Sequence, residues 1–169
     1  KEWHHKDIFA HTLQVVDNAA RLSDKMELRF AALVHDIAKP QTRRIDEKKG
    51  YTFHGHDVIG ERMINKVAVR MRLSNKITNY LKKLTRLHLR PIALVKSEVT
   101  DSAVRRLMVA ADEYLDDLML LCRADITTKN PNRVKQYLHN FERVEKKMKN
   151  VIEKDSFKAF QSPLKGKEI

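Results

Sequence analysis

The chain has 169 residues, of which 42% are hydrophobic and 33% charged, a composition that fits one soluble domain with a single core. Its four glycines and four prolines exclude collagen-like and low-complexity structures, and no apolar run approaches the roughly 18 residues of a transmembrane helix. The single cysteine, Cys122, excludes an internal disulfide framework and a CxxC zinc site, and favours a reducing, cytoplasmic location. Because the chain starts at Lys1 rather than at methionine, we interpret it as a piece of a longer protein.

The formal net charge of +12 is unevenly distributed. Residues 70–106 hold ten lysines and arginines against two acids, and residues 129–154 hold eight against three, whereas residues 107–128 hold five acids and one arginine. Two basic zones beside an acidic one suggest a polyanion-binding surface next to a cation site. When a run of charges is the only observation, exposed helix faces in contact with water explain it more often than a binding surface does. No RNP-type aromatic pattern accompanies them, so any nucleic-acid contact is expected at the backbone.

Apolar residues recur with helical spacing through most of the chain. The predicted helices cover approximately residues 7–23, 24–37, 56–72, 74–88, 101–111, 113–128 and 131–154. Their predicted caps are Asp7, Ser23 or Asp24, Ser74, Thr100 or Asp101, and Asn130, which precedes Pro131 at the first helical position. Pro40 forbids continuation of the second helix, and residues 38–55 form one longer loop that allows a short hairpin. We therefore expect a compact all-α domain.

Several histidines and aspartates stand beside apolar residues rather than among surface lysines. His11 lies within the first predicted helix, His35-Asp36 follows an apolar run, and Asp125 closely follows another. A buried carboxylate is costly unless it is paired or binds a metal. One such histidine is more often a packed or capping residue, but four or more at buried positions of separate helices favour a metal site. Imidazole nitrogen with carboxylate oxygen suits Mn, Fe, Co, Ni or Zn.

Neighbouring positions on a helix point about 100° apart. His35 and Asp36 can therefore meet one ion only near a helix end, unless Asp36 lies between two ions. Paired ions can clamp a phosphoryl group and activate water. This chemistry agrees with the lack of a serine or cysteine arrangement for covalent catalysis.

The order His11, His35-Asp36, Asp125 resembles the H…HD…D signature of the HD-domain metal-dependent phosphohydrolases. Neighbouring segments narrow the resemblance to the HD domain of bacterial tRNA nucleotidyltransferases (CCA-adding enzymes) and related poly(A) polymerases. These segments are residues 5–7, 11–13, 31–40 with Thr42, 53–57 with Gly60, and 123–125. The resemblance spans about residues 3–130. It implies an HD-domain helical bundle over residues 1–155 and a tail, 156–169, that leads to a segment outside this chain.

The resemblance also implies the roles of individual residues. The primary metal site would consist of His11, His35, Asp36 and Asp125. His56 and His88 would complete a second site bridged by Asp36, so that one or two divalent ions bind: Ni, Co, Mn, Fe or Zn, with Mg as a further option. His35, Asp36 and Lys39 would be catalytic, with Lys39 facing a substrate phosphate. Weaker candidates for substrate or phosphate binding are Thr42, Arg43, Arg90 and His54. No role is assigned to His4 or His139, and both are expected at the surface. His5 belongs to a matched segment without being an expected ligand, and Cys122 is expected to be a small core residue.

The implied activity is hydrolysis of 2′,3′-cyclic nucleotides or RNA-end phosphates by metal-activated water. The (p)ppGpp hydrolases of this superfamily carry an acidic pair where this chain has Lys39-Pro40-Gln41, so that substrate is disfavoured. No glycine-serine loop with a following DxD occurs, so the nucleotidyltransferase head is absent from this chain. The alternative is a non-catalytic module of a tRNA-processing enzyme that binds tRNA through its basic surface or forms a homodimer. A free-standing nucleotidase of the same superfamily is a third hypothesis.

Overall fold

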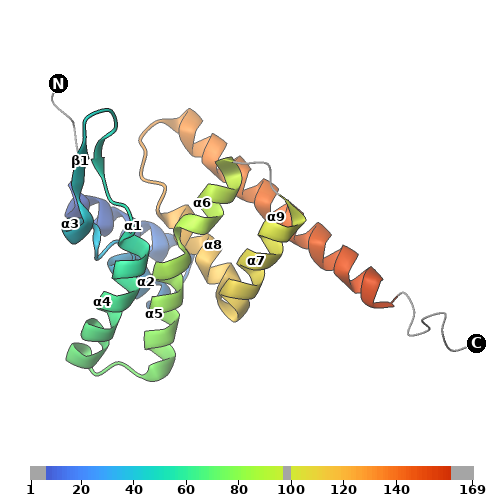
Figure 1. The fold of residues 1–169 in the computed structure, drawn as a ribbon, viewed down its shortest axis with the longest axis horizontal. Coiled ribbons are helices and arrows are strands. Elements are labelled where there is room, and N and C mark those ends of the chain that lie inside the picture. The colour runs from blue at the N-terminus through green and yellow to red at the C-terminus, as the bar shows by residue number, and fades with distance from the viewer. Residues whose placement is uncertain (1–6, 97–99, 161–169) are drawn as a thin grey trace, which may run out of the picture.

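The computed structural model describes residues 7–96 and 100–160, which form a helical domain with one short hairpin (Figure 1). The elements are α1 (Ile8–Leu22), α2 (Met26–Val34), α3 (Lys39–Thr42), β1 (Arg44–Asp46), β2 (Gly50–Thr52), α4 (His56–Met71), α5 (Asn75–Leu87), α6 (Leu89–Lys96), α7 (Asp101–Ala111), the 3-10 turn η1 (Asp112–Tyr114), α8 (Leu115–Ala124) and α9 (Pro131–Phe160). The predicted all-α class is confirmed. No helix in these two ranges is both long and apolar enough to cross a membrane.

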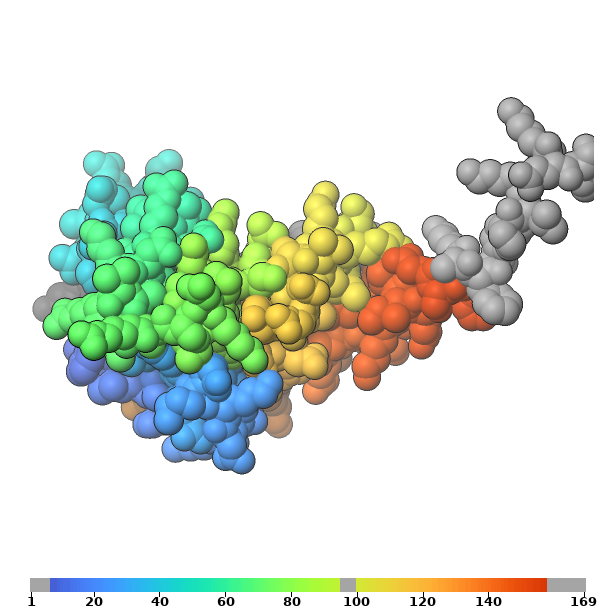
Figure 2. Space-filling model, turned by 90° about the horizontal axis from the view of Figure 1, so that it is seen from below, coloured from blue at the N-terminus to red at the C-terminus, as the bar shows by residue number. Residues whose placement is uncertain are grey.

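The core lies where α2, α4, α5 and α8 meet. Its fully buried side chains include Leu28, Ile64, Leu81, Leu84 and Leu121. Burying one such leucine or isoleucine contributes about 1.5–3 kcal/mol, so this shared layer is what fixes the helix ends relative to one another. α9 packs against α6 and α7 and extends away from the body formed by α1 to α5 (Figures 1 and 2).

Helix starts depend on local caps. Asp7 caps α1 as predicted, because its Oδ1 accepts a hydrogen bond from the Phe9 N–H at 2.9 Å. The predicted Ser23 or Asp24 cap of α2 is wrong: α2 follows Lys25, and the Ser23 N–H bonds the Ala19 carbonyl to end α1. Ser74 and Thr100 cap α5 and α7 as predicted.

The second predicted helix is divided. α2 ends at Val34 rather than at Ile37, residues 35–38 form turns, and α3 follows with Pro40 in its first turn. A proline is tolerated there because the first helical N–H groups lack intrahelical partners. The predicted hairpin is confirmed as an antiparallel pair of β1 and β2 that matches Ile45 with Tyr51.

Other boundaries also differ from the prediction. The sequence pattern missed α6, since Pro91 is typical of a helix break but lies in the first turn of this helix. α8 ends at Ala124 rather than near residue 128. α9 continues to Phe160 rather than ending near residue 154, and Asn130 Oδ1 accepts hydrogen bonds from the N–H groups of Asn132 and Arg133 at its start. Cys122 is a buried core residue, as expected.

The α4–α5 contact depends on Gly60. A Cβ at this position would lie 2.9 Å from Cγ2 of the fully buried Thr85. Gly60→Ala is therefore expected to destabilise the domain by about 1–2 kcal/mol in urea unfolding, because overpacking outweighs the better helix propensity of alanine. In a Thr85→Ser background, which lacks Cγ2, the same change is expected to be neutral or stabilising. Equal destabilisation in both backgrounds would contradict this account.

Candidate metal centre

The predicted ligands converge because most of them stand at helix ends. His11 lies in the first turn of α1, His35 and Asp36 directly follow α2, His56 begins α4, His88 follows α5, and Asp125 follows α8. At a helix end, consecutive residues need not point 100° apart, so His35 and Asp36 can face the same point. Two arrangements were expected for His35 and Asp36: a position at a helix end, or Asp36 placed between two ligand groups. The structure combines both.

The first group consists of His11, His35, Asp36 and Asp125. His11 Nε2 lies 2.9 Å from Asp125 Oδ1 and 3.6 Å from Asp36 Oδ2. His35 Nε2 lies 3.2 Å from Asp36 Oδ2 and 3.4 Å from Asp125 Oδ1. Ligand atoms that each stand about 2.1 Å from one ion are separated by about 3.0–3.4 Å, so these spacings suit a single ion.

The second group consists of Asp36, His56 and His88, all of them buried. Asp36 turns its other oxygen, Oδ1, toward this group, 3.3 Å from His56 Nε2 and 3.6 Å from His88 Nε2. The two Nε2 atoms of His56 and His88 lie 3.2 Å apart. Asp36 therefore offers one oxygen to each group.

All four histidines have their other ring nitrogen, Nδ1, held in place. Nδ1 of His35, His56 and His88 lies 2.7–2.8 Å from a backbone carbonyl, that of Ala32, Phe53 or Thr85. A carbonyl can only accept, so each Nδ1 donates, and Nε2 is the nitrogen of each ring that is directed at the cluster and can bind a cation once it carries no proton. His11 Nδ1 lies 3.0 Å from the Thr127 hydroxyl. Second hydrogen bonds of this kind orient metal-binding histidines.

Several atoms that face the cluster are buried without a hydrogen-bond partner. They are His35 Nε2, both carboxylate oxygens of Asp36, and Asp125 Oδ1. Buried polar atoms are nearly always hydrogen-bonded, and four orphaned acceptors in one place are satisfied by a cation. Borderline nitrogen and hard oxygen donors together match a divalent transition metal. The residues present therefore fit a divalent ion.

The pKa values of the clustered residues are shifted by their burial and by their closeness to one another. Burial lowers the pKa of His35, but the carboxylates of Asp125 and Asp36 outweigh it and raise this pKa to about 10. Burial opposes ionisation of Asp36, yet His35 and His56 hold its pKa well below its usual range. His88 has its pKa lowered to about 4, mainly by burial, so it stays neutral near pH 7.

Lys39 reaches the cluster from α3. Its Nζ lies 2.5 Å from Asp36 Oδ2 and 5.8 Å from the centre of the Phe53 ring. Its side chain is 23% exposed, whereas that of Asp36 is 1% exposed. The ammonium therefore stands between the buried carboxylate and solvent.

The weaker candidates do not converge with this group. The Thr42 hydroxyl donates to the Ala38 carbonyl of its own helix, and the Arg43 guanidinium lies 5.2 Å from the Tyr51 ring. His54 and Arg90 are exposed, and Arg90 lines a hollow between α6 and α7. His139 is exposed beside Glu142, while His4 and His5 lie outside the described residues.

Two residues that support the cluster were missed by sequence reasoning. Thr127 contacts the His11 ring, and the Asn18 amide donates to the Ala124 carbonyl at 2.8 Å, which ties α1 to the end of α8 beside Asp125. The position of Thr127, two residues after a predicted ligand, was the available signal. No sequence signal marks Asn18, because polar residues are common on the exposed faces of helices.

Thr127→Val is expected to weaken metal binding about 10- to 100-fold, because His11 loses the group that orients its ring. The measurement is titration of the apo domain with Ni²⁺ or Co²⁺. Thr128→Val, one residue further along, is the matched control and should retain wild-type affinity. Equal affinity of Thr127→Val and wild type would contradict the role assigned to this hydroxyl.

Fold and site together define a helical domain with a buried histidine–aspartate cluster that could hold divalent metal. Residues 8–130 match the model of the family described as HD domain, and the chain belongs to that family. It is 30% identical over 126 residues to the A-adding tRNA nucleotidyltransferase of Deinococcus radiodurans, covering 73% of this chain and 28% of that protein. The CC-adding tRNA nucleotidyltransferase of Thermus thermophilus is 30% identical over 125 residues, covering 72% of this chain and 28% of that protein.

A shorter match has a higher identity. The multifunctional CCA protein of Shewanella frigidimarina is 40% identical over 77 residues, which cover 45% of this chain and 18% of that protein. The resemblance to the HD domain of tRNA nucleotidyltransferases is thereby confirmed. The chain spans less than a third of the length of these relatives.

Proposed function

We propose that this domain is a metal-dependent phosphohydrolase that acts on 2′,3′-cyclic nucleotides or RNA-end phosphates. The observation that carries the proposal is the shared carboxylate: Asp36 directs one oxygen to each of two histidine groups, and both oxygens are buried without a hydrogen-bond partner. His11, His35, Asp36 and Asp125 would hold one ion, and His56 and His88 would hold a second with Asp36. When bound, such ions supply Lewis-acid activation of water and of the phosphoryl group.

The chain's own groups prepare the site for this chemistry. The backbone carbonyls of Ala32, Phe53 and Thr85 fix three imidazole rings, so their Nε2 atoms are already directed at the cluster. Lys39 supplies a cation at the partly exposed edge, where negative charge accumulates on a phosphoryl group. The buried aspartates stay ionised near neutral pH. The site therefore needs no protein nucleophile.

The relatives support the class of substrate. Two of those named above are tRNA nucleotidyltransferases, and this chain matches less than a third of each. An RNA 3′ end or a nucleotide derived from it is therefore the substrate that we favour.

The test is hydrolysis of 2′,3′-cyclic AMP by the purified domain with Ni, Co, Mn, Mg or Zn. The blank is the double variant His35→Ala/Asp36→Ala, and the matched control is Asp17→Ala, which removes an exposed aspartate on α1. We expect turnover with a transition metal that is lost in the blank and retained in the control. Turnover of equal rate in the blank would overturn the proposal.

A second candidate function, binding of tRNA, rests on the basic zone at residues 70–106. Lys82, Lys83 and Arg86 line a hollow between α5 and α7 that also borders Tyr114. Contacts between lysines and phosphates predict an affinity that falls steeply with salt. Lys82→Gln/Lys83→Gln should lower tRNA affinity and its salt dependence, whereas Lys48→Gln/Lys49→Gln in the hairpin turn should not. Salt-insensitive binding would contradict it.

A further inference from the structure

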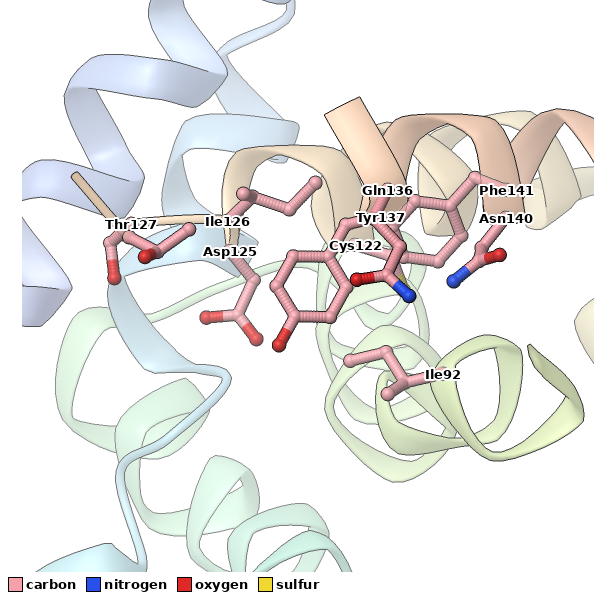
Figure 3. A pocket seen from close by; sticks show the side chains of 10 residues that line it. Ile92, Cys122, Asp125, Ile126, Thr127, Gln136, Tyr137, Asn140 and Phe141 are labelled. Atoms are coloured by element: carbon pink, nitrogen blue, oxygen red, sulfur yellow. The ribbon is translucent and has the colours of Figure 1, made fainter. Parts of the chain in front are cut away.

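A second feature borders the metal centre. A hollow of about 640 Å³ lies between α6, the loop after α8, and α9 (Figure 3). Its lining includes Asp125, Thr127, Thr128, Gln136, Tyr137 and Asn140. Asp125 belongs both to this hollow and to the first ligand group. A substrate whose phosphate meets the metal centre can therefore extend from Asp125 into this hollow.

The chemistry of the lining indicates what fits. No lysine or arginine is among the described residues that line it, and Asp125 is the charged one. A second phosphate or a continuing RNA backbone would find no counter-charge there. The lining instead offers apolar side chains, three hydroxyls and the two carboxamides of Gln136 and Asn140, which both donate and accept hydrogen bonds. The volume lies in the range of pockets that take small organic ligands.

Tyr137 gives the hollow a stacking surface. In Figure 3 its ring stands beside the Asp125 carboxylate, and the amides of Gln136 and Asn140 lie on the other side of the ring from that carboxylate. Tyr137 is 42% exposed, so much of its ring is open to a ligand. Nucleobases stack on such rings whatever their identity, while amides pair with the polar edges of a base.

The floor of the hollow is held rigidly. Phe141 is 3% exposed, and the Arg123 guanidinium lies 5.9 Å from the centre of its ring. Arg123 also forms a bidentate ion pair with Glu145 at 2.7 and 2.8 Å, which fixes α9 against α8. This part of the hollow therefore needs no ordering when a ligand binds.

We propose that this hollow is a subsite for the nucleobase and ribose of the substrate, with Tyr137 stacking on the base and Asn140 and Gln136 contacting its edge. The inference rests on the proposed function, because it places the phosphate at the metal centre. Residues 136–141 lie beyond the segment 8–130 that matches the HD family, so the subsite depends on this chain's own α9.

The test is calorimetric binding of 3′-AMP and of inorganic phosphate to the metal-loaded domain. We expect 3′-AMP to bind at least about tenfold more tightly than phosphate, since one stacked base contributes a factor of this order. Tyr137→Ala and Asn140→Leu should each weaken 3′-AMP about tenfold and leave phosphate unchanged. His139→Ala, an exposed residue on α9 outside the lining, is the matched control.

Unchanged 3′-AMP affinity in Tyr137→Ala and Asn140→Leu would overturn the inference, as would an equal loss of phosphate affinity. Hydrolysis of 2′,3′-cyclic AMP by the same proteins separates this failure from failure of the proposed function. Tyr137-dependent binding without turnover contradicts the phosphohydrolase and supports the subsite. Turnover together with 3′-AMP affinity that is unchanged in Tyr137→Ala supports the phosphohydrolase and contradicts the subsite.

Discussion

Asp36→Ala is expected to abolish binding of both metal ions and to lower kcat/KM for 2′,3′-cyclic AMP by at least about a thousandfold, or about 4 kcal/mol. The reason is the shared position of Asp36, whose Oδ2 faces His11 and His35 while its Oδ1 faces His56 and His88. No other described residue belongs to both groups. The measurement is metal content per chain by mass spectrometry, together with initial rates.

Variants of the two separate groups provide the comparison. His11→Ala removes a ligand of the first group only, and His88→Ala removes one of the second only. Each should lose one ion and keep the other, whereas Asp36→Ala should lose both. Asp36→Asn is the control for a folding defect, because the asparagine side chain has nearly the same volume as that of aspartate. Retention of one ion by Asp36→Asn and Asp36→Ala would contradict the shared carboxylate.

The second large effect concerns stability. Adding Ni²⁺ or Co²⁺ to the apo domain at about 100 times its Kd is expected to stabilise the fold by about 2.7 kcal/mol. For a chain of this size, that corresponds to a rise in Tm of about 5–11 °C. The physical cause is the set of buried polar atoms in His35, Asp36 and Asp125 that lack a hydrogen-bond partner and would coordinate the cation.

Thermal unfolding with and without a chelator measures this effect. Mg²⁺ should stabilise the domain less than Ni²⁺ does, because four of the six candidate ligands are imidazoles. The rise should be smaller in His11→Ala and absent in Asp36→Ala. An equal rise with Mg²⁺ and Ni²⁺, or the same rise in Asp36→Ala, would show that the cations act elsewhere.

The candidate metal centre was predictable because its polar residues interrupt or directly follow apolar runs. His35 and Asp36 directly follow an apolar run, and Asp125 closely follows another, where polar groups are costly unless something binds them. The structure brings all six candidate ligands together. Sequence spacing could not establish the separation of His56 and His88 from Asp36, because it depends on how α4 and α5 pack through Gly60 and Thr85.

The hollow was not predictable in this way. Tyr137, Gln136 and Asn140 stand on a long charged helix where each is an ordinary surface residue. Their relation to Asp125 arises from the docking of α9 through Arg123 and Glu145, which is a tertiary contact without a sequence pattern. α6 was missed because a proline is typical of a helix break. Pro91 instead lies in the first turn of this helix, which the sequence alone does not show.

The ion pair of Lys39 with Asp36 places a competitor for the metal inside the site. An entering cation must displace an ammonium that is tethered three residues from the carboxylate and lies 2.5 Å from Oδ2. Such an internal competitor multiplies the intrinsic affinity by the fraction of molecules in which Oδ2 is open, and so weakens metal binding. The apparent affinity of the site for a divalent ion is therefore set by Lys39 as well as by the ligands themselves.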